Sequence, residues 1–385
     1  MKKLLAIVIF LTYFMVLFAD SSYAIYDPLS LDNNKFGIHI LFPEELSDAA
    51  RLVNSSEGDW GYITIPIQAY DKDLEKWQKF MDECKKLHII PIIRLATNGD
   101  YFNTKVWEKP KMETVLDFAN FLNSLEWPIK NRYVIIFNEV NRSDEWGGLS
   151  SPKEYAEILS YATTVFKSKS LDFFVISSGM DNASENVAGE SYNQFTFFNL
   201  MNQAIPGVFN QIDGIASHSY PNPGFCQPPN VKTEKSITSF EYELNFIKNL
   251  TGKDIPVFIT ETGWTQDRFS DAQIAKFYET AFLNTWSHKK IVAVTPFLLK
   301  AGTAPFKQFS LITIENKDSE KFKKISNIKK IKGTPKLTQL NVLGKETIKE
   351  EKLPVVFFEK QKEKMEVINK NNAVIIVLKW LLNIN

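Results

Sequence analysis

Residues 89–95 read Ile89-Ile90-Pro91-Ile92-Ile93-Arg94-Leu95, an apolar run rich in β-branched residues that predicts a buried strand. A helical pattern follows this run, because apolar residues then recur at three- and four-residue spacing, at Val115, Phe118, Phe121, Leu122 and Leu125. A buried strand followed by an amphipathic helix is one βα unit, the building block of a parallel sheet.

The same alternation continues on both sides of this unit. Seven further apolar runs predict strands, at residues 36–40, 62–67, 133–137, 173–177, 214–218, 256–261 and 291–298. Clear helical patterns follow the first seven strands, and a weaker one follows the eighth near residues 317–328. Eight βα units favour an α/β fold with a closed (β/α)8 TIM barrel over residues 33–330. The alternative is a doubly wound open sheet, but residues 37–43 read GIHILFP and lack its Gly-rich phosphate turn.

The two ends of the chain differ from this pattern. Residues 1–24 combine a basic start, an apolar run over residues 4–18 and small residues, Ser22 and Ala24, at an A-x-A-like cleavage site. They predict a signal peptide cleaved after Ala24, and therefore a secreted or cell-surface protein; an uncleaved N-terminal anchor is the alternative. Residues 331–385 hold ten Lys and six Glu, and form a C-terminal extension whose structure and role the sequence does not define.

Composition excludes several classes of function. Lys and Arg together number 45, as do Asp and Glu, so there is no basic excess of the kind that nucleic-acid binding requires. The four His residues form no H-x-H or H-E-x-x-H motif, so we expect no metal site and no cofactor. Cys84 falls late in a helix and Cys226 follows a strand end, which places them at opposite ends of a barrel and predicts no disulfide between them.

Two carboxylates stand where barrel enzymes carry their chemistry, at the carboxyl ends of strands. Asn138-Glu139 ends the strand at 133–137, and Glu261 ends the strand at 256–261. Cleavage of a glycosidic bond needs such a pair, one carboxyl group to donate a proton and one to attack or to activate water. Both could instead be surface acids, although a charge directly after a buried strand is costly unless it has a partner.

Other polar and aromatic residues mark the same end of the predicted barrel. Arg94, His218 and Tyr220 close the strands at 89–95 and 214–218, and Trp264 follows Glu261. Arg94 could merely bridge an interior carboxylate, and His218 could be a core histidine. Trp264 is the favoured platform for stacking on a sugar ring, ahead of Trp107 and Trp146. Trp60 is expected at the opposite face, and Trp77 and Trp286 in the core.

Three segments together resemble the clan A glycoside hydrolases, the cellulase- and xylosidase-like TIM-barrel glycosidases. Residues 137–141 (FNEVN) resemble the family's Asn-Glu acid/base signature, residues 259–264 (ITETGW) its nucleophile segment, and residues 216–221 (ASHSYP) its His/Tyr segment. Each motif is weak by itself, but their order and spacing over about residues 33–330 make the set fairly specific.

The resemblance implies a role for each matching residue. Glu139 would be the acid/base and Glu261 the nucleophile of a retaining glycosidase, with the two carboxyl groups about 5–5.5 Å apart. Substrate-binding and supporting roles fall on Asn138 at the sugar 2-OH, Tyr220 beside Glu261, His218 near the pair and Arg94 beside the nucleophile. We therefore expect a monomer that cleaves β-linked glycosides or polysaccharides without a cofactor.

Two features depart from the family pattern. The eighth strand reads TPFLL over residues 295–299, so Phe297 stands where the family often has a Trp beneath the sugar. Asn138 and Glu139 are adjacent, yet both should face the mouth, which requires a bulge or the end of the strand at Asn138. Phe297 is the best support for a rival function, a non-catalytic carbohydrate-binding barrel. A phosphate-handling barrel is a weaker rival, because Gly-rich turns after the seventh and eighth strands are missing.

Overall fold

The computed structural model describes residues 25–338. The predicted signal peptide, residues 1–24, and the extension from residue 339 onward lie outside the described residues. Residues 331–338 of the predicted extension do lie within them, and they run along the barrel: the amide of Lys130 donates to the carbonyl of Lys336 at 2.8 Å, and that of Gly333 to Asp59 at 3.0 Å.

The sheet has eight parallel strands in the order of the sequence, which confirms the predicted barrel. Strands one and eight are joined by a parallel bridge between Phe36 and Val294, and the amide of His39 donates to the carbonyl of Pro296 at 3.0 Å. The strands are β1 (Gly37–His39), β2 (Gly61–Gln68), β3 (Ile89–Ala96), β4 (Arg132–Ile135), β5 (Phe173–Ser177), β6 (Gly214–His218), β7 (Val257–Glu261) and β8 (Ile291–Val294).

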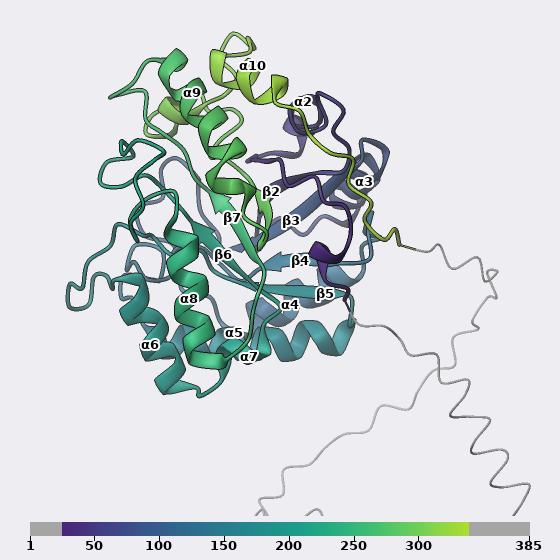
Figure 1. Ribbon diagram of the computed structural model, residues 1–385. Helices are drawn as coiled ribbons and strands as arrows, with labels where there is room; N and C mark the ends of the chain where they lie inside the picture. The colour runs from purple at the N-terminus through teal and green to yellow at the C-terminus, as the bar shows by residue number, and fades with distance from the viewer. Residues whose placement is uncertain (1–24, 339–385) are drawn as a thin grey trace, which may run out of the picture. The chain divides into compact units, whose positions relative to one another are not determined.

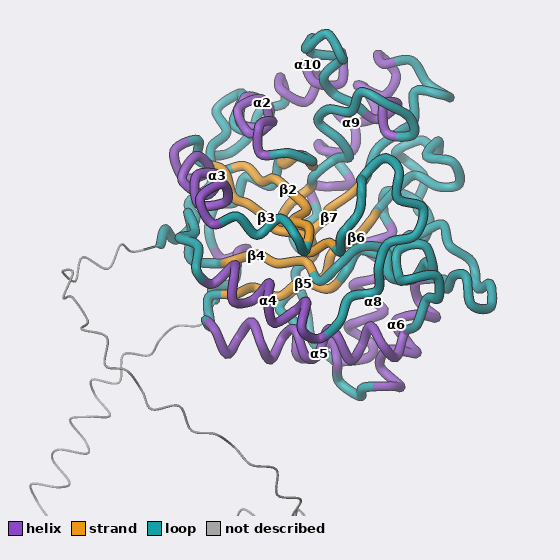
Figure 2. The backbone as a smooth tube through the Cα atoms, turned by 180° about the vertical axis from the view of Figure 1, so that it is seen from behind, coloured by secondary structure: helices purple, strands orange, loops and turns teal. Residues whose placement is uncertain are grey.

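Helices surround the strands in both views of the ribbon (Figures 1 and 2). The weak eighth pattern is α10 (Glu320–Asn327), which packs beside α9 and α2 and so completes the ring. The others are α2 (Leu46–Val53), α3 (Leu74–Lys86), α4 (Met112–Asn123), α5 (Pro152–Lys169), α6 (Gln194–Ala204), α7 (Val208–Gln211), α8 (Ser239–Thr251) and α9 (Asp271–Leu283), with 3-10 turns η1 (Pro28–Ser30), η2 (Pro43–Glu45), η3 (Thr285–Ser287) and η4 (Phe306–Phe309).

The strands read as continuous apolar runs because both of their faces are buried. One face packs against the helices, and the other fills the lumen with side chains such as Tyr62, Ile92, Tyr133 and Phe258. The lumen is therefore a packed core rather than a channel. Trp77 and Trp286 are buried among the helices, as predicted.

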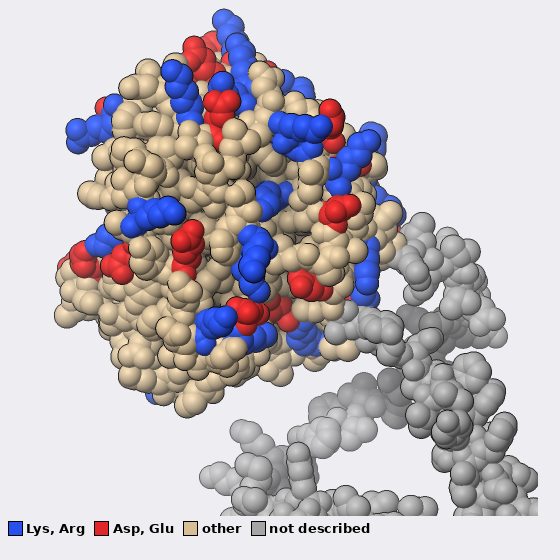
Figure 3. Space-filling view, in the orientation of Figure 1, with Lys and Arg blue, Asp and Glu red and all other residues tan. Residues whose placement is uncertain are grey.

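The amino-terminal segment covers the bottom of the barrel. Ile25 and Leu29 pack against the lumen core, as does Trp60 at the start of β2. Because the bottom is covered, the end of the barrel where the strands finish is the one left for an active site. On the face drawn in Figure 3, acidic and basic side chains are interspersed. Within residues 25–338, no helix has both the length and the apolar character needed to cross a membrane.

Candidate active site

A pocket opens at the carboxyl ends of the strands, with a volume of about 300 Å³. The ends of β3 and β7 and the loops after β1, β3, β4 and β8 supply its lining, which includes Arg94, Glu261, Asn138 and Glu139. A carboxylate oxygen of Glu139 and one of Glu261 lie within 4.8 Å of each other and of a ring nitrogen of His218. The two carboxylates predicted to form a pair therefore face each other across the mouth.

The early end of β4 explains how two adjacent residues both reach the pocket. β4 ends at Ile135, and the backbone then enters the left-handed region at Phe137 (φ 65°) and at Glu139 (φ 38°). Such conformations are uncommon for residues other than glycine and concentrate at functional sites. The amide of Glu139 donates to the carbonyl of Gly179 at 3.0 Å, which fixes the turn to the end of β5. The alternation of side chains between the two faces of a strand has therefore ended before Asn138, so Asn138 and Glu139 can both face the pocket.

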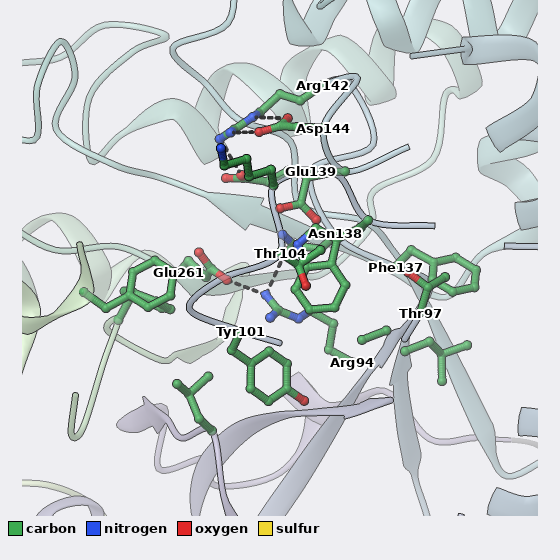
Figure 4. A pocket seen from close by; sticks show the side chains of 18 of the residues that line it. Arg94, Thr97, Tyr101, Thr104, Phe137, Asn138, Glu139, Arg142, Asp144 and Glu261 are labelled. Carbon is green, nitrogen blue, oxygen red and sulfur yellow. Dashed lines mark hydrogen bonds and ion pairs between the residues drawn. The ribbon is translucent and has the colours of Figure 1, made fainter. Parts of the chain in front are cut away.

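Glu261 is buried and accepts hydrogen bonds from two sides. The Arg94 guanidinium lies 2.5 Å from its Oε1, and the Tyr220 hydroxyl donates to its Oε2 at 3.1 Å. The same Arg94 nitrogen donates to Asn138 Oδ1 at 2.6 Å, so one cation orients both residues (Figure 4). The Glu261 carboxylate is therefore oriented by a cation on one side and a hydroxyl donor on the other. The predicted positions of Arg94 and Tyr220 are thus both at the site.

Glu139 has a different set of neighbours. His218 Nδ1 lies 2.9 Å from its Oε1, and the Arg142 guanidinium donates to its Oε2 at 3.1 Å. Burial lowers the pKa of His218, but the Glu261 carboxylate and the hydrogen bond to Glu139 outweigh it, so the pKa is raised above its ordinary value. His218 Nδ1 is also 3.8 Å from Glu261 Oε2, so the imidazole contacts both carboxylates.

Two polar residues at the site, Arg142 and Glu145, were missed by the sequence reasoning, and His39, one of the two histidines that the sequence allows to reach the mouth, lies there as well. Arg142 also pairs with Asp144, and Glu145 lines the pocket beside it. Burial and the nearby Glu139 raise the pKa of Glu145 to about 8. His39 Nε2 lies 3.7 Å from Glu261 Oε1, and burial followed by the positive charge of Arg94 lowers the pKa of His39 well below its usual value.

The prediction that Trp264 contacts sugar is wrong. Its side chain is 1% exposed, its indole nitrogen donates to the carbonyl of Gln227 at 2.8 Å, and its ring packs against Tyr278 and Trp286. The chain turns away from the mouth directly after β7, so the indole enters the layer between barrel and helices. Trp146 is likewise buried, whereas Trp107 lines the pocket.

Phe297 lies in the loop just after β8 and lines the pocket, at the position where the family often has a Trp. Its ring packs edge-on against His39, with centroids 5.2 Å apart. An aromatic surface is therefore present at this position, although a smaller one.

The cluster of Glu139, His218 and Glu261 offers three atoms of the kind that bind metal ions. Both carboxylates already have a guanidinium partner, Arg142 for Glu139 and Arg94 for Glu261. These two charges repel a further cation from the space between the carboxylates.

No protein-family model and no curated protein matches the sequence. Solved structures do match. A family 39 glycoside hydrolase from Bacteroides cellulosilyticus aligns with a TM-score of 0.56 and 17% identity, over 78% of this chain and 64% of that one. A family 51 α-L-arabinofuranosidase from Bifidobacterium longum aligns with a TM-score of 0.53 and 11% identity, over 80% and 74%.

A third match is a family 39 β-xylosidase from Caulobacter crescentus, with a TM-score of 0.51 and 12% identity over 80% of this chain and 72% of that one. The chain has the fold of these glycoside hydrolases. It spans 64% of the length of the Bacteroides protein, and at such identities the likeness defines the fold alone.

Proposed function

We propose that this protein is a retaining glycoside hydrolase that cleaves β-linked glycosides, with Glu261 as the nucleophile and Glu139 as the acid/base. The observation that carries the proposal is the short separation of the two carboxylates, whose nearest oxygens lie within 4.8 Å. Retaining enzymes hold their carboxyl groups about 5–5.5 Å apart, whereas inverting enzymes leave about 6.5–9.5 Å for a water molecule.

The neighbours of each carboxylate support the assignment of roles. Arg94 and Tyr220 hold the buried Glu261 carboxylate in one orientation from two sides, as an attacking group requires. Glu139 is paired with His218, a group that can itself hold or release a proton. Glu139 would donate its proton to the leaving oxygen while Glu261 attacks the anomeric carbon. In the second step, Glu139 would remove a proton from the water molecule that hydrolyses the glycosyl-enzyme and releases the sugar.

Separating the two roles by mutation tests this proposal. Glu139→Ala should slow natural substrates far more than 2,4-dinitrophenyl glycosides, because that leaving group hardly needs a proton. Azide should restore its turnover and give a β-glycosyl azide. Glu261→Ala should form no glycosyl-enzyme, and azide should enter from the opposite face to give the α product.

The control is Glu126→Ala, an exposed glutamate beyond the end of α4 that should leave all rates unchanged. Opposite azide products in the two variants would reverse the assignment of roles. Wild-type activity in both variants would show that neither carboxylate is catalytic.

A second candidate function is carbohydrate binding without cleavage. Phe297 favours it, because a smaller ring at the end of β8 alters the floor of the pocket. Saturable binding of an oligosaccharide by the wild-type protein, with no turnover of any dinitrophenyl glycoside, would establish this alternative instead.

A further inference from the structure

The pocket is bounded by two long loops that follow strands distant in the sequence. One is the β3 loop (residues 97–111), which supplies Tyr101, Thr104 and Trp107 to the lining. The other is the β8 loop (residues 295–319), which supplies Phe297, Pro305 and Phe306. In a barrel these loops stand on either side of the short β1 and β2 loops, so a cleft across the mouth would pass between them.

Aromatic contacts close that passage. The rings of Phe102 in the β3 loop and Phe306 in the β8 loop pack with centroids 5.8 Å apart. Phe306 packs in turn on Phe297, at 5.2 Å. Beside them, Tyr101 packs against Phe42 of the β1 loop, at 6.1 Å. The β8, β3 and β1 loops therefore form one wall, which we call the aromatic bridge and define as Phe42, Tyr101, Phe102 and Phe306.

The wall continues on the other side of the β3 loop. The amide of Trp107 donates to the carbonyl of Asp144 at 2.7 Å, and the amide of Gly147 donates to the carbonyl of Trp107 at 2.9 Å. The β3 loop is thus tied to the β4 loop, which carries Arg142, Asp144 and Glu145. It is also braced internally, because Asp100 accepts from the amides of Phe102 and Asn103. The loops that follow β8, β3 and β4 therefore form one continuous wall of the pocket.

We infer that the enzyme removes single sugars from the non-reducing ends of chains and does not cut within them. This inference rests on the proposed function. A polysaccharide can lie across an active site only if the cleft is open at both ends. Here the pocket that reaches Glu261 ends at the aromatic bridge, so the sugar attached to the nucleophile must be terminal. The pocket volume of about 300 Å³ is at the small end of the range for ligand sites, which suits a terminal unit.

The probes for this inference are 4-nitrophenyl β-D-xylopyranoside and β-D-glucopyranoside, together with xylo- and cellopentaose labelled at the reducing end. Each pentaose is also prepared with its non-reducing end blocked by a bulky acetal. The wild-type protein should hydrolyse a monosaccharide glycoside, shorten a labelled pentaose by one sugar at a time, and leave the blocked form intact.

Opening the bridge should change this pattern. Phe102→Ala and Phe306→Ala remove partly exposed rings, so neither change empties the core. Each should raise hydrolysis of the blocked pentaose by about tenfold or more relative to wild type, because the clash with the acetal is relieved. Phe195→Ala, which removes a partly buried ring on α6 away from the mouth, is the matched control and should still reject the blocked form.

The outcomes separate this inference from the proposed function. Wild-type cleavage of the blocked pentaose, or release of labelled di- or trisaccharide before labelled tetrasaccharide, would overturn the terminal-sugar inference while leaving the glycosidase intact. Blocked substrate that stays uncut by both alanine variants would show that the aromatic bridge is not the barrier. If the protein hydrolysed none of these probes, the proposed function would be contradicted, and the inference with it.

Discussion

Arg94 is the residue on which the charge balance of the site depends. It is 8% exposed and contacts Glu261 and Asn138 through the same guanidinium nitrogen. Removing one partner of a buried ion pair leaves the other charge without compensation, and this usually costs more than the pair itself contributes. The stability of the fold therefore depends on this buried pair.

We expect Arg94→Met to lower the free energy of unfolding by about 3–5 kcal/mol, because the Glu261 carboxylate is then buried without a cation. The double variant Arg94→Met/Glu261→Gln should regain most of this loss, since no charge remains to compensate. Arg142→Met is the control: its side chain is 37% exposed, so loss of its pairs with Glu139 and Asp144 should cost only about 1 kcal/mol. Urea denaturation measures all three. A double variant no more stable than Arg94→Met would contradict this account.

At the scale of elements, the ends of β4, β5 and β6 hold one another in place at Gly179, in the loop after β5. Its carbonyl accepts from the amide of Glu139 at 3.0 Å, and its Cα faces the His218 ring. A Cβ at this position would lie 2.5 Å from His218 Nε2, closer than two such atoms can approach. Only glycine therefore lets the β5 loop hold both Glu139 and its imidazole partner in place.

Gly179→Ala should therefore push His218 away from Glu139 and reduce kcat/KM by about 10²-fold, since small displacements of catalytic groups are costly. Secondary structure should be retained, because the clash lies in a loop. Gly302→Ala is the matched control, since an added Cβ there meets nothing within 4 Å. Rates on a dinitrophenyl glycoside and circular dichroism of both variants provide the measurement. Equal rates for the two variants would mean that the His218 position is unimportant.

The elements also show what the sequence could predict. Buried strands have a strong apolar signature, so their ends, and with them Arg94, Glu139 and Glu261, could be located. Arg142 and Glu145 lie in an irregular loop where no periodicity indicates which side chains turn inward. Trp264 was misplaced for a related reason: the rule that strand ends face the mouth stops at Glu261, where β7 ends.

At the scale of the whole molecule, three buried or pocket-lining carboxyl groups on different elements share one property. Burial raises the pKa of Glu45 and of Glu243 to about 7, and that of Glu145 to about 8, each from an ordinary value of 4.5. The folded state therefore holds protons that the unfolded chain has released. Between about pH 4.5 and 8, these three groups make stability fall as the pH rises, because each binds its proton more tightly in the folded state; His39, whose pKa burial lowers, contributes the opposite slope around its ordinary pKa.

Glu243 on α8 isolates one contribution to this fall. It is 2% exposed, Ser217 donates to its Oε1 at 3.0 Å, and its Oε2 has no hydrogen-bond partner among residues 25–338. With a folded pKa of about 7, it stabilises the fold fully below about pH 4.5, and this contribution is lost as the pH rises through 7. One pKa unit corresponds to about 1.4 kcal/mol, so the full loss is on the order of 3 kcal/mol.

Glu243→Gln cannot ionise, so its free energy of unfolding should fall less than that of wild type between pH 5 and pH 8. The exposed Glu113→Gln should keep the wild-type slope, and urea denaturation at the two pH values compares them. An unchanged slope in Glu243→Gln would mean that this carboxyl group ionises in the folded protein as readily as in water.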